Sequence, residues 1–165
     1  MKTILGIDPM DEGALVWIKP DGEMTCEDMP TLKTSKTRQE VDVPNLLDLV
    51  RHSPQGTRAY IEKMQPMPKG GNANFKRGGY LYLFRAIFAT LGMSFVEVPP
   101  KTWQKLFGIK SSKGNDTKAQ SYLIATRLFP DLEFKTPRGR DLDGRCDAAL
   151  IAEYGRKLEV GNGKN

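Results

Sequence analysis

The sequence predicts an α/β domain in which helices flank a mixed central sheet of five strands. Short apolar runs bounded by turn residues dominate the first 62 residues, as in strands, whereas helical periodicity dominates after residue 80. The length of 165 residues is enough for one hydrophobic core and short for two. We therefore expect one domain over residues 1–158 and a frayed tail over residues 159–165.

Five segments have the pattern of strands. The first three are separated by the turn sequences PMDEG and PDG, which favours an antiparallel meander. The segments TRAYIEK and SFVEV supply the fourth and fifth strands. The five cover residues 2–8, 14–19, 23–27, 57–63 and 94–98.

Capping and stop signals place four of the helices. The segment VPNLLDLVRHS starts near Pro44, and PPKTWQKLFG also begins at a proline. The segment NDTKAQSYLIATRLFP has Asp116 near its N-terminus and ends at Pro130. The last helix runs from about Leu142 to Leu158.

A fifth helix, over residues 80–91, has apolar side chains on two sides. Leu81, Phe84 and Phe88 form one side. Leu83 and Ile87 form a second side, which is more than one sheet face requires. We therefore expect a two-fold dimer through this helix.

Two polar stretches are predicted to be loops. Residues 31–43 lack an apolar pattern, and residues 63–79 are rich in Gly, Pro, Asn and basic residues. A mobile loop as long as residues 63–79 is usually functional or disordered in a compact domain, and we expect a role in binding here. Phe75 and Tyr80 near this loop either stack on an unpaired base or pack in the core.

The basic residues concentrate in the middle of the chain. Residues 63–140 contain 14 Lys and Arg against 4 Asp and Glu, whereas residues 1–62 contain 7 against 11 and residues 141–165 contain 4 against 5. A central block this basic predicts a polyanion-binding surface. A solvated basic face is the alternative.

The composition also indicates the cellular compartment of the protein. Arg85 interrupts the most hydrophobic stretch, so no run of about 18 apolar residues remains, and the first residues lack the order of a secretion signal. The two cysteines, Cys26 and Cys146, are too few for a disulfide scaffold and lack a CxxC pattern. We expect a protein of the cytoplasm with reduced thiols and no membrane association.

Acidic residues interrupt apolar runs at three places distant in the sequence. Asp8 ends ILGID, Glu62 ends AYIE, and Asp143 and Asp147 precede or begin the apolar run AALIA. The last two share a helix face with Ile151. Carboxylates in apolar surroundings need a cation or hydrogen bonds. If the first and fourth strands are parallel neighbours, their terminal acids meet at one edge of the sheet.

Hard oxygen donors without nearby His or Cys are the ligands that Mg²⁺ or Mn²⁺ prefers. Together with a polyanion-binding surface, they predict metal-assisted phosphodiester hydrolysis, with two ions roughly 4 Å apart that clamp the attacking water and the leaving oxygen. Asp143 has an alternative explanation, because acids are also favoured at the N-terminus of a helix.

The motifs ILGIDP, AYIEKMQ, VPPKTWQK, TKAQSYLIA and DGRCDAALIAEY occur in this order over residues 4–154. The ordered set resembles the RuvC-type Holliday junction resolvases of the RNase H-like superfamily, particularly the short forms of bacteriophages. The resemblance implies an RNase H-like fold and a homodimer that cuts two opposed strands of a four-way DNA junction in a bacterial cell or phage-infected host. It also implies that Asp8, Glu62 and Asp147 bind the metal and that Asp143 supplies the fourth ligand.

Two positions depart from the family pattern. Met10 stands where a glycine commonly follows the proline of GIDP. Asp143 and Asp147 are four residues apart, whereas bacterial members usually separate these acids by three, and Gly144 occupies the three-apart position. Both spacings keep the two acids on one helix face.

Nine basic residues are expected to contact the DNA. Lys101 and Lys118 match positions where the family commonly carries lysines near the DNA and the active site. The others belong to the basic block, where a plain solvated side chain is the alternative for each. The nine are Lys76, Arg77, Lys101, Lys105, Lys110, Lys113, Lys118, Arg138 and Arg140.

Other functions stay open at this point. A related nuclease would act on another branched DNA or on an RNA–DNA hybrid. An actin-like ATPase, suggested by GIDP alone, would need a second phosphate-binding loop and an adenosine pocket, for which 165 residues leave little room. A non-catalytic junction binder would not need acids at three distant places.

Overall fold

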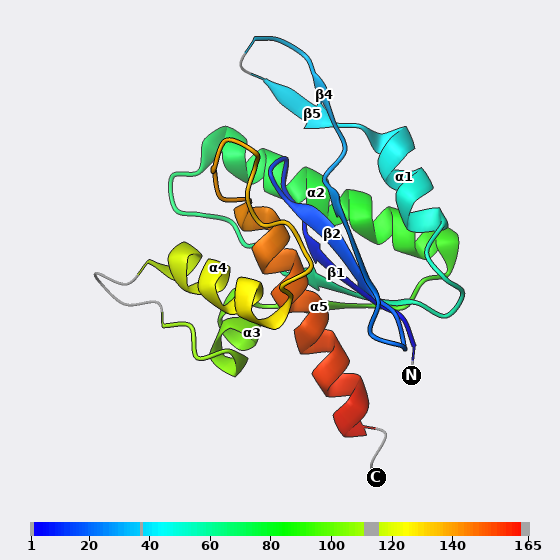
Figure 1. Ribbon diagram of the computed structural model, residues 1–165. Helices are drawn as coiled ribbons and strands as arrows, with labels where there is room; N and C mark the ends of the chain where they lie inside the picture. Colours follow the sequence, from blue (N-terminus) through cyan, green and yellow to red (C-terminus); the bar gives the residue numbers. More distant parts are fainter. Residues whose placement is uncertain (1, 37, 111–115, 163–165) are drawn as a thin grey trace.

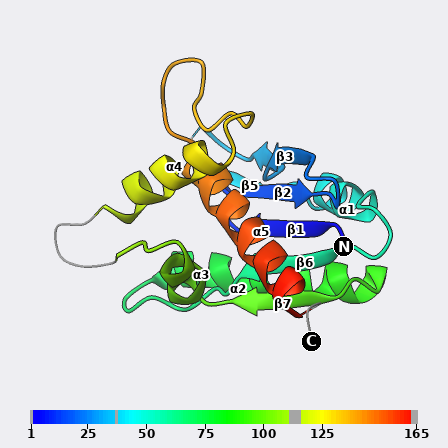
Figure 2. The ribbon, with the colours of Figure 1, turned by 60° about the horizontal axis from the view of Figure 1, so that its bottom comes forward.

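The computed structural model describes residues 2–36, 38–110 and 116–162. These residues are coloured along the sequence in Figure 1. Within them the central sheet is mixed and five-stranded, in the order β3-β2-β1-β6-β7, and Figure 2 labels these strands. This confirms the predicted fold class and all five predicted strands. The strands are β1 (Ile4–Asp8), β2 (Ala14–Ile18), β3 (Met24–Asp28), β6 (Arg58–Glu62) and β7 (Phe95–Val98).

The sheet register brings two acids to the same edge. β1 is antiparallel to β2 but parallel to β6, with Ile7 opposite Ile61. Asp8 and Glu62, each one residue further on, therefore end neighbouring parallel strands. The sequence predicted that the two acids would meet if these strands were parallel neighbours, and they are.

The helices form two layers, one on each face of the sheet (Figure 2). One hydrophobic cluster joins the sheet to α3 (Pro100–Leu106), α4 (Thr117–Leu128) and α5 (Asp143–Asn162). The other joins the opposite face to α1 (Val43–Arg51) and α2 (Gly71–Leu91). The apolar runs of β1 and β2 are buried on both sides, which explains their continuous hydrophobicity.

Glycines let α5 lie directly against β1 and the turn after it. A Cβ atom on Gly6 would lie 2.3 Å from the backbone oxygen of Ala148, and one on Gly144 would lie 2.1 Å from that of Glu12. The N-terminal half of α5 is therefore held close to the end of β1. A side chain at position 144 would therefore collide with the backbone of the turn after β1.

The predicted loop over residues 63–79 is wrong for its second half, because α2 begins at Gly71. Asn74 bonds to both the backbone N–H and the backbone oxygen of Met67 at 2.8 Å, which ties the first turn of α2 to the preceding segment. The Tyr80 hydroxyl donates to Asp11 at 2.7 Å, and Lys76 pairs with the same carboxylate. These tertiary contacts override the poor helix propensity of the Gly and Asn residues.

The predicted loop over residues 31–43 is also wrong. It contains a two-stranded hairpin, β4 (Thr31–Lys33) and β5 (Gln39–Val41), and α1 starts at its end. The Thr31 hydroxyl donates to the Gln39 side chain at 3.0 Å, and Lys76 of α2 donates to the backbone oxygen of Gln39 at 3.0 Å. The hairpin is thus held by partners that a local pattern does not reveal.

The predicted frayed tail is wrong for residues 159–162, which continue α5. The Glu159 carboxylate accepts hydrogen bonds from Arg58 and from the Tyr60 hydroxyl, both at 2.8 Å. These bonds from β6 hold the last turns of the helix. Residues 163–165 lie outside the described part of the chain.

Neither cysteine forms a disulfide, and burial raises the pKa of both thiols to about 12. Across residues 2–36, 38–110 and 116–162, none of the helices has both the length and the apolar character needed to cross a bilayer.

Candidate active site

Four acidic side chains act on one another where β1, β6 and α5 meet. Asp8 ends β1, Glu62 ends β6, Asp143 opens α5 and Asp147 lies one turn further along it. Burial raises the pKa of Asp8 well above its ordinary value, and the charges of Asp147, Glu62 and Asp143 raise it further. The fold therefore brings the carboxylates of three distant segments within electrostatic reach of one another.

Asp147 and Glu62 are each held by a neighbour that the sequence did not single out. Burial raises the pKa of Asp147 to about 7, while a hydrogen bond from the buried Ser121 of α4 opposes this shift. Burial also raises the pKa of Glu62, opposed by the indole N–H of Trp103, which donates to Oε2 at 3.0 Å. Trp103 is fully buried, and the one polar atom of its side chain bonds to this carboxylate.

Lys118 supplies the positive charge of the cluster. Its Nζ lies 2.7 Å from Asp143 Oδ2, and this hydrogen bond raises the pKa of Lys118. Its charge also opposes the upward shift in the pKa of Asp8 and Asp147. The lysine side chain is 70% exposed, so it is accessible to a bound anion as well as to Asp143.

The donor chemistry of this cluster fits a hard divalent cation. All four side chains offer carboxylate oxygens, and three of them are held in surroundings that disfavour an uncompensated negative charge. In the described residues no group of three or more His, Cys, Asp or Glu has the geometry of a formed metal-binding cluster, and Asp143 pairs with Lys118 instead.

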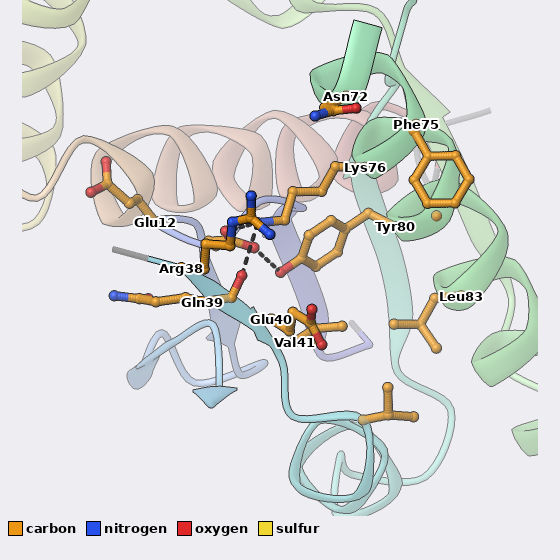
Figure 3. A pocket seen from close by; sticks show the side chains of 13 residues that line it. Glu12, Arg38, Gln39, Glu40, Val41, Asn72, Phe75, Lys76, Tyr80 and Leu83 are labelled. Atoms are coloured by element: carbon orange, nitrogen blue, oxygen red, sulfur yellow. Dashed lines mark hydrogen bonds and ion pairs between the residues drawn. The ribbon is translucent and has the colours of Figure 1, made fainter. Parts of the chain in front are cut away.

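Two hollows adjoin the turn between β1 and β2. A hollow of about 630 Å³ lies between this turn, the start of α4 and the start of α5, and Lys118, Asp143 and Arg140 are among its lining residues. A larger one of about 900 Å³ lies between the turn, β5 and the first half of α2 (Figure 3). Asp11 and Glu12 line both hollows, so both hollows border the turn between β1 and β2.

The structure separates the two aromatic residues near the larger hollow. Tyr80 is buried, 3% exposed, and its hydroxyl is bonded to Asp11, so core packing is correct for this residue. Phe75 is 87% exposed at the rim, whereas the Lys76 and Tyr80 side chains point into the hollow, where both contact Asp11 (Figure 3). Stacking on a base stays a prediction for Phe75 alone.

Three of the predicted DNA-contacting residues line these hollows: Lys76 lines the larger one, and Lys118 and Arg140 line the smaller one. Lys76 pairs with Asp11, and one guanidinium nitrogen of Arg77 is buried without a hydrogen-bond partner, so neither cation is fully displayed to solvent. The other described members of the set are exposed, on α3, after α3, on α4 and on the connection between α4 and α5. Lys113 lies outside the described residues. The exposed members are Lys101, Lys105, Lys110, Lys118, Arg138 and Arg140.

The second apolar side of α2 packs inside the monomer, so it gives no support to the predicted dimer. Ile87 is 5% exposed and packs with Phe84 and Phe88 in the monomer core, and Leu83 lies against the same cluster. The large side chains that α2 leaves exposed are Phe75 and Tyr82.

Comparison with solved structures supports the fold independently. The chain is similar to Thermus thermophilus RuvC in complex with Holliday junction substrate, with a TM-score of 0.62, 14% sequence identity and 96% of each chain covered. It is similar to a second Thermus thermophilus RuvC structure with a TM-score of 0.60 and 15% identity, over 95% of this chain and 96% of the other. No protein-family model and no curated protein sequence matches this chain. The shared architecture is the RNase H-like fold of RuvC.

Proposed function

We propose that this protein is a structure-specific endodeoxyribonuclease that resolves four-way (Holliday) DNA junctions by divalent-metal-dependent phosphodiester hydrolysis. The observation that carries the proposal is the gathering of Asp8, Glu62, Asp143 and Asp147 at one edge of an RNase H-like sheet. The similar RuvC chain was solved in complex with a Holliday junction substrate, which supports branched DNA as the substrate.

The four carboxylates would hold Mg²⁺, with Mn²⁺ as a substitute and two ions in each site. When bound, the ions would polarise the scissile phosphate and stabilise charge on the attacking and leaving oxygens. Trp103 fixes one oxygen of Glu62, and Ser121 bonds to Asp147, so both acids are oriented before substrate binds.

Basic side chains position the substrate. Lys118, beside Asp143 and largely exposed, is placed to contact the phosphate nearest the acids. Exposed lysines on α3, such as Lys101, contact phosphates further along the arm. Each phosphate contact contributes about 0.9 to the dependence of log affinity on log salt concentration.

Resolution of a four-way junction requires two cuts, and therefore two carboxylate sites. We propose that two chains associate through the outer face of α2. Tyr82 lies on this face and is 68% exposed there. A two-fold pair of chains would place equivalent sites on opposed strands.

The test is incubation of the purified protein with labelled four-way junction, duplex, flap and RNA–DNA hybrid, each with Mg²⁺, Mn²⁺ or EDTA. We expect paired cuts in the junction with either metal and none in EDTA. Preferential cutting of the flap or the hybrid would replace the junction with that substrate. Binding of the junction without any cutting would reduce the protein to a junction binder.

A further inference from the structure

The connection between α4 and α5 forms a tight, ordered turn. Thr136 N–H donates to the Arg140 backbone oxygen and Gly139 N–H donates to the Thr136 oxygen, both at 2.8 Å. Arg140 N–H also donates to the Thr136 hydroxyl at 3.0 Å. Gly139 has a φ of 82°, which a residue with a side chain rarely adopts. These bonds leave Pro137 and Arg138 at the apex of the turn.

The base of this α4–α5 hairpin, residues 134–142, is anchored to both helices. Phe134 is 4% exposed in the core, and its backbone oxygen accepts from Leu142 N–H at 2.9 Å. Lys135 Nζ lies 4.9 Å from the ring centroid of Tyr122 on α4 and 3.4 Å from Asp141. The hairpin therefore projects from a fixed base that leads directly into Asp143 and the carboxylate cluster.

The apex displays arginine side chains to solvent. Arg138 is exposed and makes no hydrogen bond or ion pair with any residue of the described chain. Arg140 is 70% exposed and has a long ion pair of 3.8 Å to Glu12. Figure 2 shows the hairpin, in orange, extending past α4 from the N-terminal end of α5. The bonded turn fixes the backbone that carries Arg138, so on contact with a ligand the conformational freedom that is lost is that of the side chain alone.

On the basis of the proposed function, we propose that Arg138 enters the minor groove of the DNA arm whose phosphate lies at the carboxylate cluster. Thr136 and Arg140 are bonded to each other at the base of the turn. Between them, Arg138 is the long side chain at the apex. A single arginine fits the minor groove, which is about 6 Å wide and whose negative potential attracts guanidinium groups. A ribbon that fills the major groove needs two longer paired strands, whereas a single bridge, between Lys135 and Asp141, joins the two sides here.

The length of chain limits which base pairs Arg138 can reach. Asp143 is five positions after Arg138, with four residues between them, so their Cα atoms lie at most about 18 Å apart. At roughly 3.4 Å for each base pair, the contacted groove lies within about five base pairs of the cut.

The experiment measures binding in EDTA to junctions whose six base pairs next to the branch point are all G·C or all inosine·C. Inosine lacks the amino group that guanine places in the minor groove and leaves the major groove unchanged. We expect the wild-type protein to bind the inosine·C junction about tenfold more tightly. Arg138→Ala and Arg138→Lys should both lose this ratio, because the strongly hydrated lysine does not replace a planar guanidinium. Arg127→Ala, an exposed arginine in the last turn of α4, is the matched control and should keep the ratio.

An equal ratio in wild type and Arg138→Ala would overturn the inference. Uniform weakening on both junctions, with a salt slope reduced by about one, would also overturn it and assign Arg138 to a phosphate. Cleavage of an unmodified junction with Mg²⁺ is measured in parallel. Cleavage without groove dependence would remove this inference alone, whereas absence of cleavage would overturn the proposed function.

Discussion

Asp147 should make the metal-free protein less stable as the pH rises. Its pKa is raised from 3.8 to about 7 by burial, so the folded state binds more protons than the unfolded state between these values. Its contribution to the free energy of unfolding is fully present below pH 3.8 and is lost as the pH rises through about 7. One pKa unit corresponds to about 1.36 kcal/mol, so the loss between pH 5 and pH 8 is roughly 2.6 kcal/mol.

The assay is thermal unfolding in EDTA at pH 5 and pH 8. For a chain of this size, about 2–4 °C corresponds to 1 kcal/mol, so the wild-type Tm should fall by about 5–10 °C from this residue alone. The upward pKa shifts of Asp8 and Glu62 act in the same direction. Asp147→Asn should show a smaller fall and a higher Tm than wild type at pH 8, because no charge is buried at that position.

Addition of Mg²⁺ at pH 8 should raise the wild-type Tm more than that of Asp147→Asn, since a ligand that binds the folded state stabilises it. Asp131→Asn, at an exposed position after α4, is the control and should behave as wild type. The reasoning fails if wild type and Asp147→Asn lose the same stability between pH 5 and pH 8.

Three other changes test separate parts of the structure. Trp103→Phe keeps a buried ring but removes the donor to Glu62, so single-turnover cleavage should slow by about tenfold while the circular dichroism spectrum is unchanged; an unaltered rate would show that the indole N–H does not position this acid. Gly144→Ala should destabilise the protein by more than about 2 kcal/mol in urea unfolding because its Cβ meets backbone, whereas Gly161→Ala, with open space around it, should not. Tyr82→Asp should convert a dimer to monomer in sedimentation, and a wild-type protein that is already monomeric at micromolar concentration would contradict the α2 interface.

The sequence was informative about the acids because their signal is local. A carboxylate at the end of an apolar strand is visible in ILGID and AYIE, and parallel pairing of β1 with β6 then brings Asp8 and Glu62 to one edge. Ser121 and Trp103 gave no such signal. Each contacts an acid more than 20 residues away, through helix packing that no local pattern encodes.

The errors in secondary structure have the same cause. The Gly- and Asn-rich start of α2 has low intrinsic helix propensity, and its stability depends on Lys76 and Tyr80 reaching Asp11 across the fold. β4 and β5 form beside that contact, through Gln39. Local composition therefore indicated a loop in both segments, and tertiary contacts decided otherwise.

Comparison of Asp8→Asn with wild type on one labelled four-way junction in Mg²⁺ tests the central claim most directly. The account predicts paired cuts by wild type and by the control Asp131→Asn, and no detectable cuts by Asp8→Asn. It also predicts that Asp8→Asn binds the junction at least as tightly as wild type, because one negative charge beside the DNA is removed. Cleavage by Asp8→Asn at the wild-type rate would contradict the assignment of this acidic cluster as the active site.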